Sequence, residues 1–213
     1  MNNRLQSHFF WGSHAPLSTL SCAALIILAS ARLAYAILCA GAILWVYGLT
    51  ALVFFSSRPL MPQKGKFFVL LFLSVFFSSL YILLAGLINP LLISATWFFL
   101  IIIPPCCTGS GLFEGMENSE TGEILSRVCQ EAFCLALIII AFSLIREPLG
   151  LGTLSFPGGI WGIFEFFEDT KDGDGFFPIQ LLSVSSGGFL LLGIGAAIFR
   201  YLRGMQSESG DES

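Results

Sequence analysis

Long apolar runs, separated by short polar stretches, recur along most of the chain. A helix needs about 20 apolar residues to cross roughly 30 Å of hydrocarbon, so runs near this size are candidate membrane spans. Six runs predict helices: Leu17–Leu28, Leu33–Phe55, Phe67–Ile88, Leu91–Ile103, Val128–Ile145 and Ile179–Leu202. The pattern therefore predicts an all-α integral membrane protein with six transmembrane segments.

The first and fourth runs are shorter than the others. Each has only about a dozen residues, too few to span the bilayer alone. The fourth run stops at Pro104-Pro105, where the second proline removes a helix N–H. We expect both to be short, broken helices. Because a longer run begins at Leu33, directly after the first, the pair indicates a helical hairpin and not a cleaved signal peptide.

Composition supports a membrane location and excludes several function classes. Apolar residues make up 55 % of the 213 residues and charged residues 11 %, which leaves too little polar surface to cover a soluble globule. The net charge is −4 and no basic block occurs, so nucleic-acid binding is not expected. The sequence has no Ser/His/Asp constellation, P-loop or dinucleotide fingerprint, and we expect no catalysis by the chain alone.

The distribution of charge between loops predicts the orientation. If all six segments cross, seven of the ten Lys and Arg residues share one side with both termini, against Arg32, Arg146 and Lys171 on the other. The positive-inside rule then places both termini in the cytoplasm. The acidic loop at about 147–178 is then external, and its aromatic residues predict a segment lying in the membrane interface.

We expect one membrane domain over residues 1–213, built from two halves, 1–90 and 91–203, and followed by a polar C-terminal tail, 204–213. Each half contains one of the short segments. Interrupted segments in corresponding positions of two halves are typical of an inverted repeat, and the interruptions tend to meet near the midplane and build a site.

Cysteines mark both predicted breaks, with Cys22 at the first and Cys106-Cys107 at the second. The alternative is that these cysteines are small apolar packing residues, which is our interpretation of Cys39, Cys129 and Cys134 inside ordinary spans. Two thiolates do not complete a zinc or iron–sulfur site, which usually takes four protein ligands. A second chain would have to supply the rest. Near the second break, Glu114 is the acidic residue that we consider for an ion path.

Two stretches resemble motifs of a known family. Residues 105–114, P-C-C-T-G-S-G-L-F-E, keep the cysteine, glycine and glutamate of a T-N-C-x-x-x-G-R-x-E motif, an alignment that selects Cys107 over Cys106. Residues 145–154, I-R-E-P-L-G-L-G-T-L, are similar to an L-R-E-x-x-G-x-G-T-L-F motif. The chain thus resembles the small six-helix membrane proteins of the Rnf and Na⁺-translocating NADH:quinone oxidoreductase (Nqr) complexes, and it is closest to the Rnf E and Nqr D type.

This resemblance implies a function and a partner. Cys22 and Cys107 would be two ligands of an iron–sulfur centre, of the 2Fe–2S kind, whose other ligands come from a paralogous six-helix subunit of the Rnf A or Nqr E type. The centre would relay electrons across a bacterial inner membrane between flavin-bearing subunits. The complex would couple this electron flow to Na⁺ or H⁺ transport.

Two other functions remain open at this point. One is a six-helix transporter or channel-like subunit in which the cysteines only pack. The other is a membrane thiol–disulfide enzyme that uses Cys106 and Cys107, although adjacent cysteines are poorly placed for an unstrained disulfide and no C-x-x-C occurs.

Overall fold

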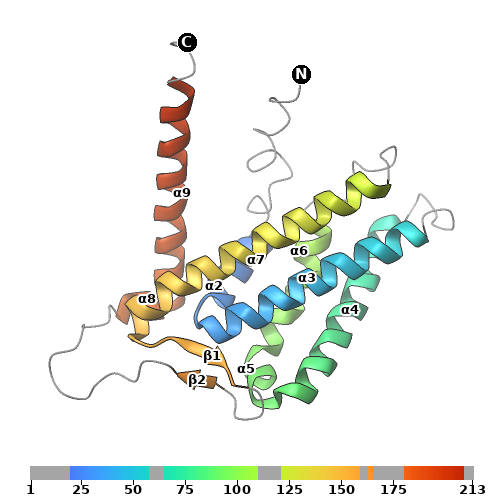
Figure 1. The fold of residues 1–213 in the computed structure, drawn as a ribbon, viewed down its shortest axis with the longest axis horizontal. Helices are drawn as coiled ribbons and strands as arrows, with labels where there is room; N and C mark the ends of the chain where they lie inside the picture. The colour runs from blue at the N-terminus through green and yellow to red at the C-terminus, as the bar shows by residue number, and fades with distance from the viewer. Residues whose placement is uncertain (1–19, 58–64, 110–120, 159–162, 166–179, 209–213) are drawn as a thin grey trace.

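A computed structural model describes residues 20–57, 65–109, 121–158, 163–165 and 180–208. Helices dominate this part of the chain (Figure 1). They are α2 (Leu20–Ala29), α3 (Leu33–Ser56), α4 (Lys66–Ile88), α5 (Pro90–Ile101), α6 (Ile103–Gly109), α7 (Thr121–Leu151), α8 (Gln180–Ser183) and α9 (Ser185–Glu208).

Two short strands depart from the predicted all-α fold. Strands β1 (Ser155–Pro157) and β2 (Ile163–Glu165) form an antiparallel pair in which Phe156 lies opposite Phe164. Glu165 also makes an ion pair of 3.1 Å with Arg32, at the corner between α2 and α3. This part of the loop, predicted to lie in the membrane interface, therefore forms a small hairpin at one end of the helices.

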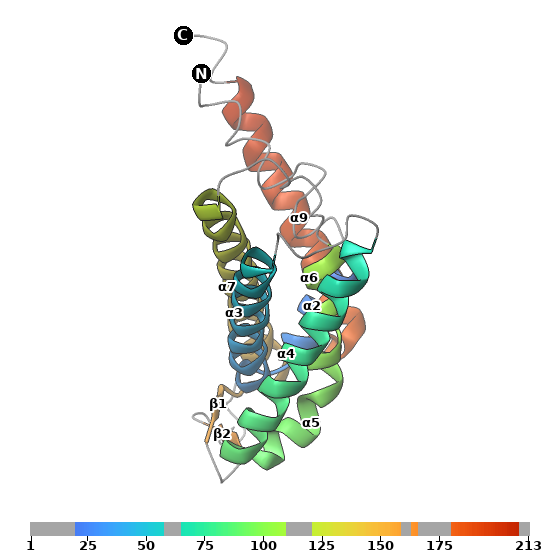
Figure 2. The same ribbon diagram turned by 90° about the vertical axis from the view of Figure 1, so that its right-hand side faces the viewer.

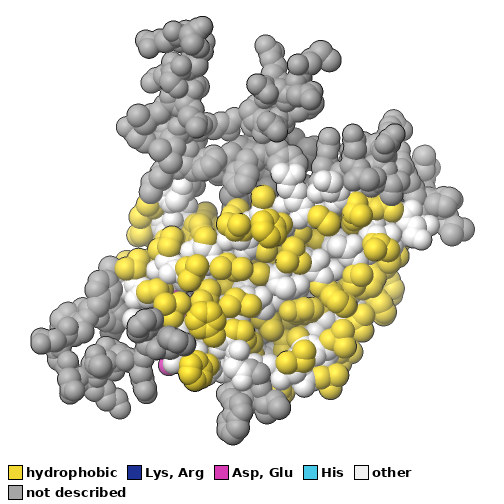
Figure 3. Space-filling view, viewed as in Figure 1, with side chains coloured by type: hydrophobic (Ala, Val, Ile, Leu, Met, Phe, Trp, Pro, Cys, Tyr) yellow, Lys and Arg dark blue, Asp and Glu magenta, His cyan; other side chains and the backbone are white. Residues whose placement is uncertain are grey.

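Four helices in the described residues are long and apolar enough to cross a membrane, not the six that we predicted. They are α3, α4, the combined α5–α6 segment Pro90–Gly109, and the Val128–Leu151 part of α7. Apolar side chains cover the described part of the face in Figure 3. Several apolar helices of this length indicate a multi-pass membrane protein.

The fourth run is longer than predicted. The run is broken as predicted, but the break lies at Ile102, and the chain continues as α6 through Pro104-Pro105 to Gly109 and does not stop at the prolines. Both prolines lie in the first turn of α6. Backbone N–H groups there have no acceptor within the helix, so a proline removes no helical hydrogen bond.

The last run is also interrupted. Predicted as one span over Ile179–Leu202, it is divided at Val184 into α8 and α9, and its apolar stretch within the described residues, Ser185–Gly195, is too short to cross. The first run forms the ten-residue α2, short as predicted. The structure therefore interrupts the fourth run at Ile102 and the last run at Val184.

Helices α3 and α7 run antiparallel and pack along much of their length, and Figure 2 shows them on one side of α2, α4 and α5. At one end of this pair, Glu147 Oε2 accepts a hydrogen bond of 2.6 Å from Leu33 N, and Ser155 Oγ accepts one of 3.3 Å from Ala34 N. These N–H groups belong to the first turn of α3, where the helix offers no acceptor. Side chains from the second half of the chain thus cap a helix of the first.

Helix α4 buries only one narrow stripe, formed by Leu70, Ser74 and Ser78. Ser78 Oγ donates a 3.0 Å hydrogen bond to Leu100 O in α5. Small residues and interhelical hydrogen bonds let membrane helices approach closely where burial of apolar surface gives little driving force. Several large side chains of α4, such as Phe68 and Phe72, are exposed, as expected for a lipid-facing surface.

Candidate functional site

Three cysteines from distant parts of the sequence meet inside the bundle. Cys22, Cys106 and Cys107 each have 0 % exposure. The side chains of Cys22 and Cys106 share a hydrogen bond, and Cys107 lies close to Cys22. We call these three residues the cysteine cluster.

Two short helices bring the cluster together. Cys22 lies near the start of α2, while Cys106 and Cys107 follow the two prolines of α6. Helix α6 is held by local bonds, because Cys106 N donates to Ile102 O at 3.3 Å and Thr108 Oγ1 donates to Pro104 O at 3.1 Å. Helices α2 and α6 pack against each other, which places the thiols from the two halves of the chain in contact.

Two polar side chains lie beside the cysteine cluster. Tyr47 of α3 is fully buried, and Glu131 of α7 is 3 % exposed. Tyr47 lies near all three cysteines and Glu131. Among the described residues, the hydroxyl of Tyr47 and the Oε1 atom of Glu131 have no hydrogen-bond partner. Unpartnered polar atoms are costly inside a bundle and mark this region as more than apolar packing.

The sequence interpretation missed both of these residues. It considered Glu114, which lies outside the described residues. A usable signal was present, because Glu131 is a charged residue within the fifth apolar run, and ionisable residues inside membrane spans are functional candidates. Tyr47 gave no such signal, because tyrosine is an ordinary constituent of apolar runs.

The structure separates the predicted ligand residues from the other cysteines. Cys22 of α2 and Cys107 of α6, the two predicted ligands, lie in the same cysteine cluster, together with Cys106. Cys39 is buried in α3, Cys134 is half-buried and Cys129 is exposed. The positions of Cys106 and Cys107 in the structure do not favour Cys107 as the ligand, so that choice stays a prediction.

The donors of the cysteine cluster fit an iron–sulfur centre in kind but not in number. Thiolates are the usual protein ligands of such clusters. Within the described residues, no group of three or more His, Cys, Asp or Glu side chains is arranged to hold a metal ion. The contribution of ligands by a second chain stays a prediction.

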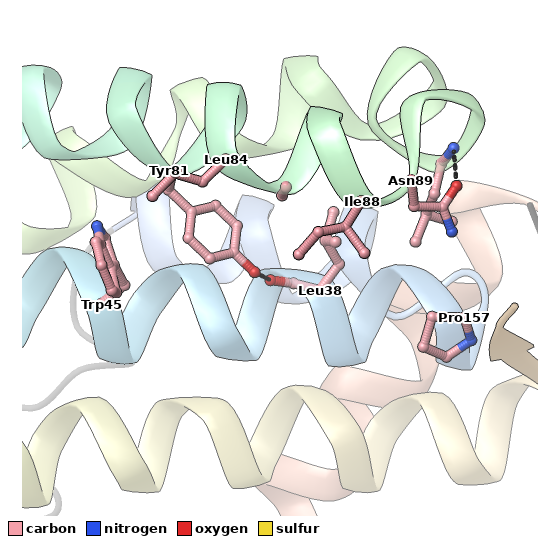
Figure 4. Close-up of a pocket in the computed structure, with 9 residues that line it drawn as sticks. Leu38, Trp45, Tyr81, Leu84, Ile88, Asn89 and Pro157 are labelled. Carbon is pink, nitrogen blue, oxygen red and sulfur yellow. Dashed lines mark hydrogen bonds between the residues drawn. The ribbon is translucent and has the colours of Figure 1, made fainter. Parts of the chain in front are cut away.

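A groove between α3 and α4 lies apart from the cysteine cluster (Figure 4). Its walls are mainly apolar and include Leu38, Trp45 and Leu84. Tyr81 lies across it and donates a 2.9 Å hydrogen bond to Leu38 O, while Asn89 at its end accepts one of 3.0 Å from Leu92 N and caps α5. These polar groups are satisfied locally, so the groove presents apolar surface and no reactive group.

Comparison of the sequence with known protein families gives no match, and neither does comparison with curated proteins.

Proposed function

We propose that this chain is a membrane subunit of an ion-translocating electron-transport complex of the Rnf or Nqr type. In this proposal the protein relays electrons across the bilayer through an iron–sulfur centre shared with a paralogous subunit. The observation that supports it best is the buried cysteine cluster, in which Cys22 and Cys107 come from opposite halves of the chain. Three thiols that meet at two short helices could act together as ligands, whereas Cys39, which among the described residues is buried alone in α3, could not.

Cys22 and Cys107 would each hold the centre through one thiolate, and the paralogous subunit would supply two more. When bound, such a centre carries one electron at a time. The protein holds the two thiols in a water-excluding bundle and sets Tyr47 and Glu131 beside them. Since both thiols are 0 % exposed in the chain alone, assembly with the partner has to open a path to them.

The partners and the location follow from the same proposal. The chain would lie in a bacterial inner membrane with both termini cytoplasmic, next to flavin-bearing subunits that deliver and remove the electrons. The whole complex, and not this chain alone, would couple electron flow to movement of Na⁺ or H⁺.

The decisive experiment is purification of the chain co-expressed with its paralogue, followed by iron analysis and electron paramagnetic resonance of the reduced complex. We expect an iron–sulfur signal that Cys22→Ser and Cys107→Ser each abolish, since each removes one of four attachments. Cys39→Ser and Cys134→Ser are matched controls that should keep it.

Two outcomes would contradict the proposal. A colourless complex without iron would favour the transporter or channel-like alternative. An ordered single chain that carries a complete centre without its paralogue would show that the ligands are not shared.

A further inference from the structure

Arg146 lies where the end of the short helix α2 meets the break between α8 and α9. It is 2 % exposed and belongs to α7, although its place in the sequence predicted a loop residue. Its guanidinium makes five hydrogen bonds, with Ile27 O at 2.5 Å, Ser30 Oγ at 3.1 Å, Leu182 O at 2.8 Å, Ser183 O at 3.3 Å and Val184 O at 3.0 Å. An arginine side chain has five N–H donors, so one acceptor is present for each.

These acceptors belong to the C-terminal ends of two short helices. Ile27 and Ser30 lie at the end of α2, and the other three carbonyls lie at the end of α8 and at the break before α9. The last carbonyls of a helix have no partner within it, and in a membrane bundle water does not replace that partner. The positive charge also complements the negative C-terminal end of a helix.

The surrounding backbone is shaped to fit this side chain. A Cβ atom at Gly188 of α9 would lie 2.9 Å from Ile27 Cγ2 and 3.1 Å from Arg146 Nη1. A Cβ atom at Gly150 of α7 would lie 2.9 Å from Ser183 N. Glycine at both positions therefore lets α7, α8 and α9 approach closely enough for one guanidinium to reach both helix ends.

From these contacts we infer that Arg146 is a positioning residue for Cys22. Ile27 and Cys22 lie in the same ten-residue helix, only about one and a half turns apart. Because α2 is a single short helix, the hydrogen bonds that fix its C-terminal end also fix the position of the Cys22 thiol beside Cys106. The same guanidinium ties α2 to the break before α9, so these two segments are held in one register. The relevance of this positioning to electron transfer rests on the proposed function. The positioning itself rests on the contacts and does not depend on that function.

Disulfide formation between Cys22 and Cys106 reports this geometry directly. Both thiols are oxidised to one disulfide, and the two electrons and two protons pass to diamide, which becomes the hydrazine. The full-length chain in membranes would carry serine in place of Cys39, Cys107, Cys129 and Cys134. The rate of cross-linking would be read by mass spectrometry.

We expect Arg146→Met to slow the cross-linking about tenfold or more, because hydrogen bonds from a charged donor are lost at the α2 end. Arg146→Lys keeps the charge but has only three donors, so its rate should be intermediate. Tyr81→Phe is the matched control, because it also loses a hydrogen bond between helices, to Leu38 O, but leaves α2 untouched. Its rate should equal that of the parent chain.

An Arg146→Met chain that folds and cross-links at the parent rate would overturn the inference. If that variant does not accumulate, Ser30→Ala decides the question, because it removes one acceptor of Arg146 and the serine bond to Ile27 O without burying a new group. A slower rate supports the positioning role, and an unchanged rate contradicts it. Absence of iron from a complex with normal cross-linking would instead count against the proposed function alone.

Discussion

At the scale of single residues, the interior of this protein combines thiols with polar oxygens. Cys106 shares a hydrogen bond with Cys22, and Glu131 and Tyr47 each present an oxygen with no hydrogen-bond partner next to the cysteine cluster. Each of these side chains is almost completely buried. In such surroundings a single hydrogen bond gained or lost affects both stability and the electronic properties of a bound group.

The contact between Cys106 and Cys22 leads to a contrast between two substitutions. Cys106→Ser and Cys106→Ala should both keep the iron of the complex, because the proposed function assigns the ligand role to Cys107. Cys106→Ala should lower the reduction potential of the centre more than Cys106→Ser, since a hydrogen bond to sulfur stabilises the more negative, reduced state. Potentiometric titration would measure the difference. Loss of iron in both variants would instead make Cys106 a ligand.

Replacement of Glu131 should change stability and electron transfer in opposite directions. Glu131→Leu should raise the free energy of unfolding by about 1–3 kcal/mol, because it removes a buried oxygen that has no hydrogen-bond partner. Thermal unfolding in detergent would measure the change. Electron transfer in the assembled complex should fall despite the gain in stability, as is common where a functional site carries unfavourable groups. A stability loss would show that the carboxylate has a structural partner.

At the scale of the elements, the structure is held by side chains that satisfy helix ends. Glu147 and Ser155 cap the start of α3, Arg146 binds the ends of α2 and α8, and Asn89 caps the start of α5. Three of these four residues come from the second half of the chain and serve helices that the apolar runs alone would leave with unsatisfied backbone groups. Within the sequence stretch 145–154, Arg146 and Glu147 therefore have structural roles as partners of helix ends.

Replacement of Glu147 should show the value of such a cap. Glu147→Leu leaves Leu33 N without its acceptor and should cost about 1–3 kcal/mol of unfolding free energy, whereas Glu147→Gln keeps an oxygen acceptor and should cost less. Thermal unfolding would measure both. The control is Glu165→Gln, which breaks the partly exposed ion pair with Arg32 and should cost no more than about 1 kcal/mol. Equal losses at Glu147 and Glu165 would rule out a special role for the buried cap.

At the scale of the whole molecule, the helix ends fall into two groups. The end of α3 and the starts of α4 and α7 lie at one end of the bundle, and the α2–α3 corner, the α4–α5 junction and the hairpin lie at the other (Figure 1). The count of cations assumed that all six segments cross, whereas four helices of the described residues are long enough to do so, and the orientation stays a prediction. Removing the buried Arg146 from that count leaves two cations, Arg32 and Lys171, on the side predicted to be external, so the asymmetry becomes stronger.

Cysteine labelling would test the orientation. In a chain with Cys129→Ser, which removes the exposed native thiol, a cysteine at Phe164 should react only with reagent added outside the cell. A cysteine at Ser56, at the opposite end of α3, should react only from the cytoplasm, as the positive-inside rule requires. The opposite pattern at both positions would reverse the orientation, and labelling of both from one side would contradict the two-ended arrangement.

Sequence patterns alone located the long helices well. The runs Leu33–Phe55 and Phe67–Ile88 agree with α3 and α4 to within a residue at each end, because the thickness of the hydrocarbon sets helix length locally. They also singled out Cys22 and the Cys106-Cys107 pair, which the structure places within the short helices α2 and α6. The inverted repeat and the identity of a cofactor remain predictions, since neither follows from helix positions.

What the sequence by itself determined is therefore the class of protein, the main spans and the residues worth testing. Only the tertiary structure decided that the helix continues past Pro104-Pro105, that the last run breaks at Val184, and that Glu131 and Arg146 lie inside the bundle. The physical reason is that the cost of a proline, a helix end or a buried charge depends on whether distant groups satisfy the backbone and side-chain atoms that it leaves open. Those distant groups, such as the five acceptors around Arg146, become neighbours only when the chain folds.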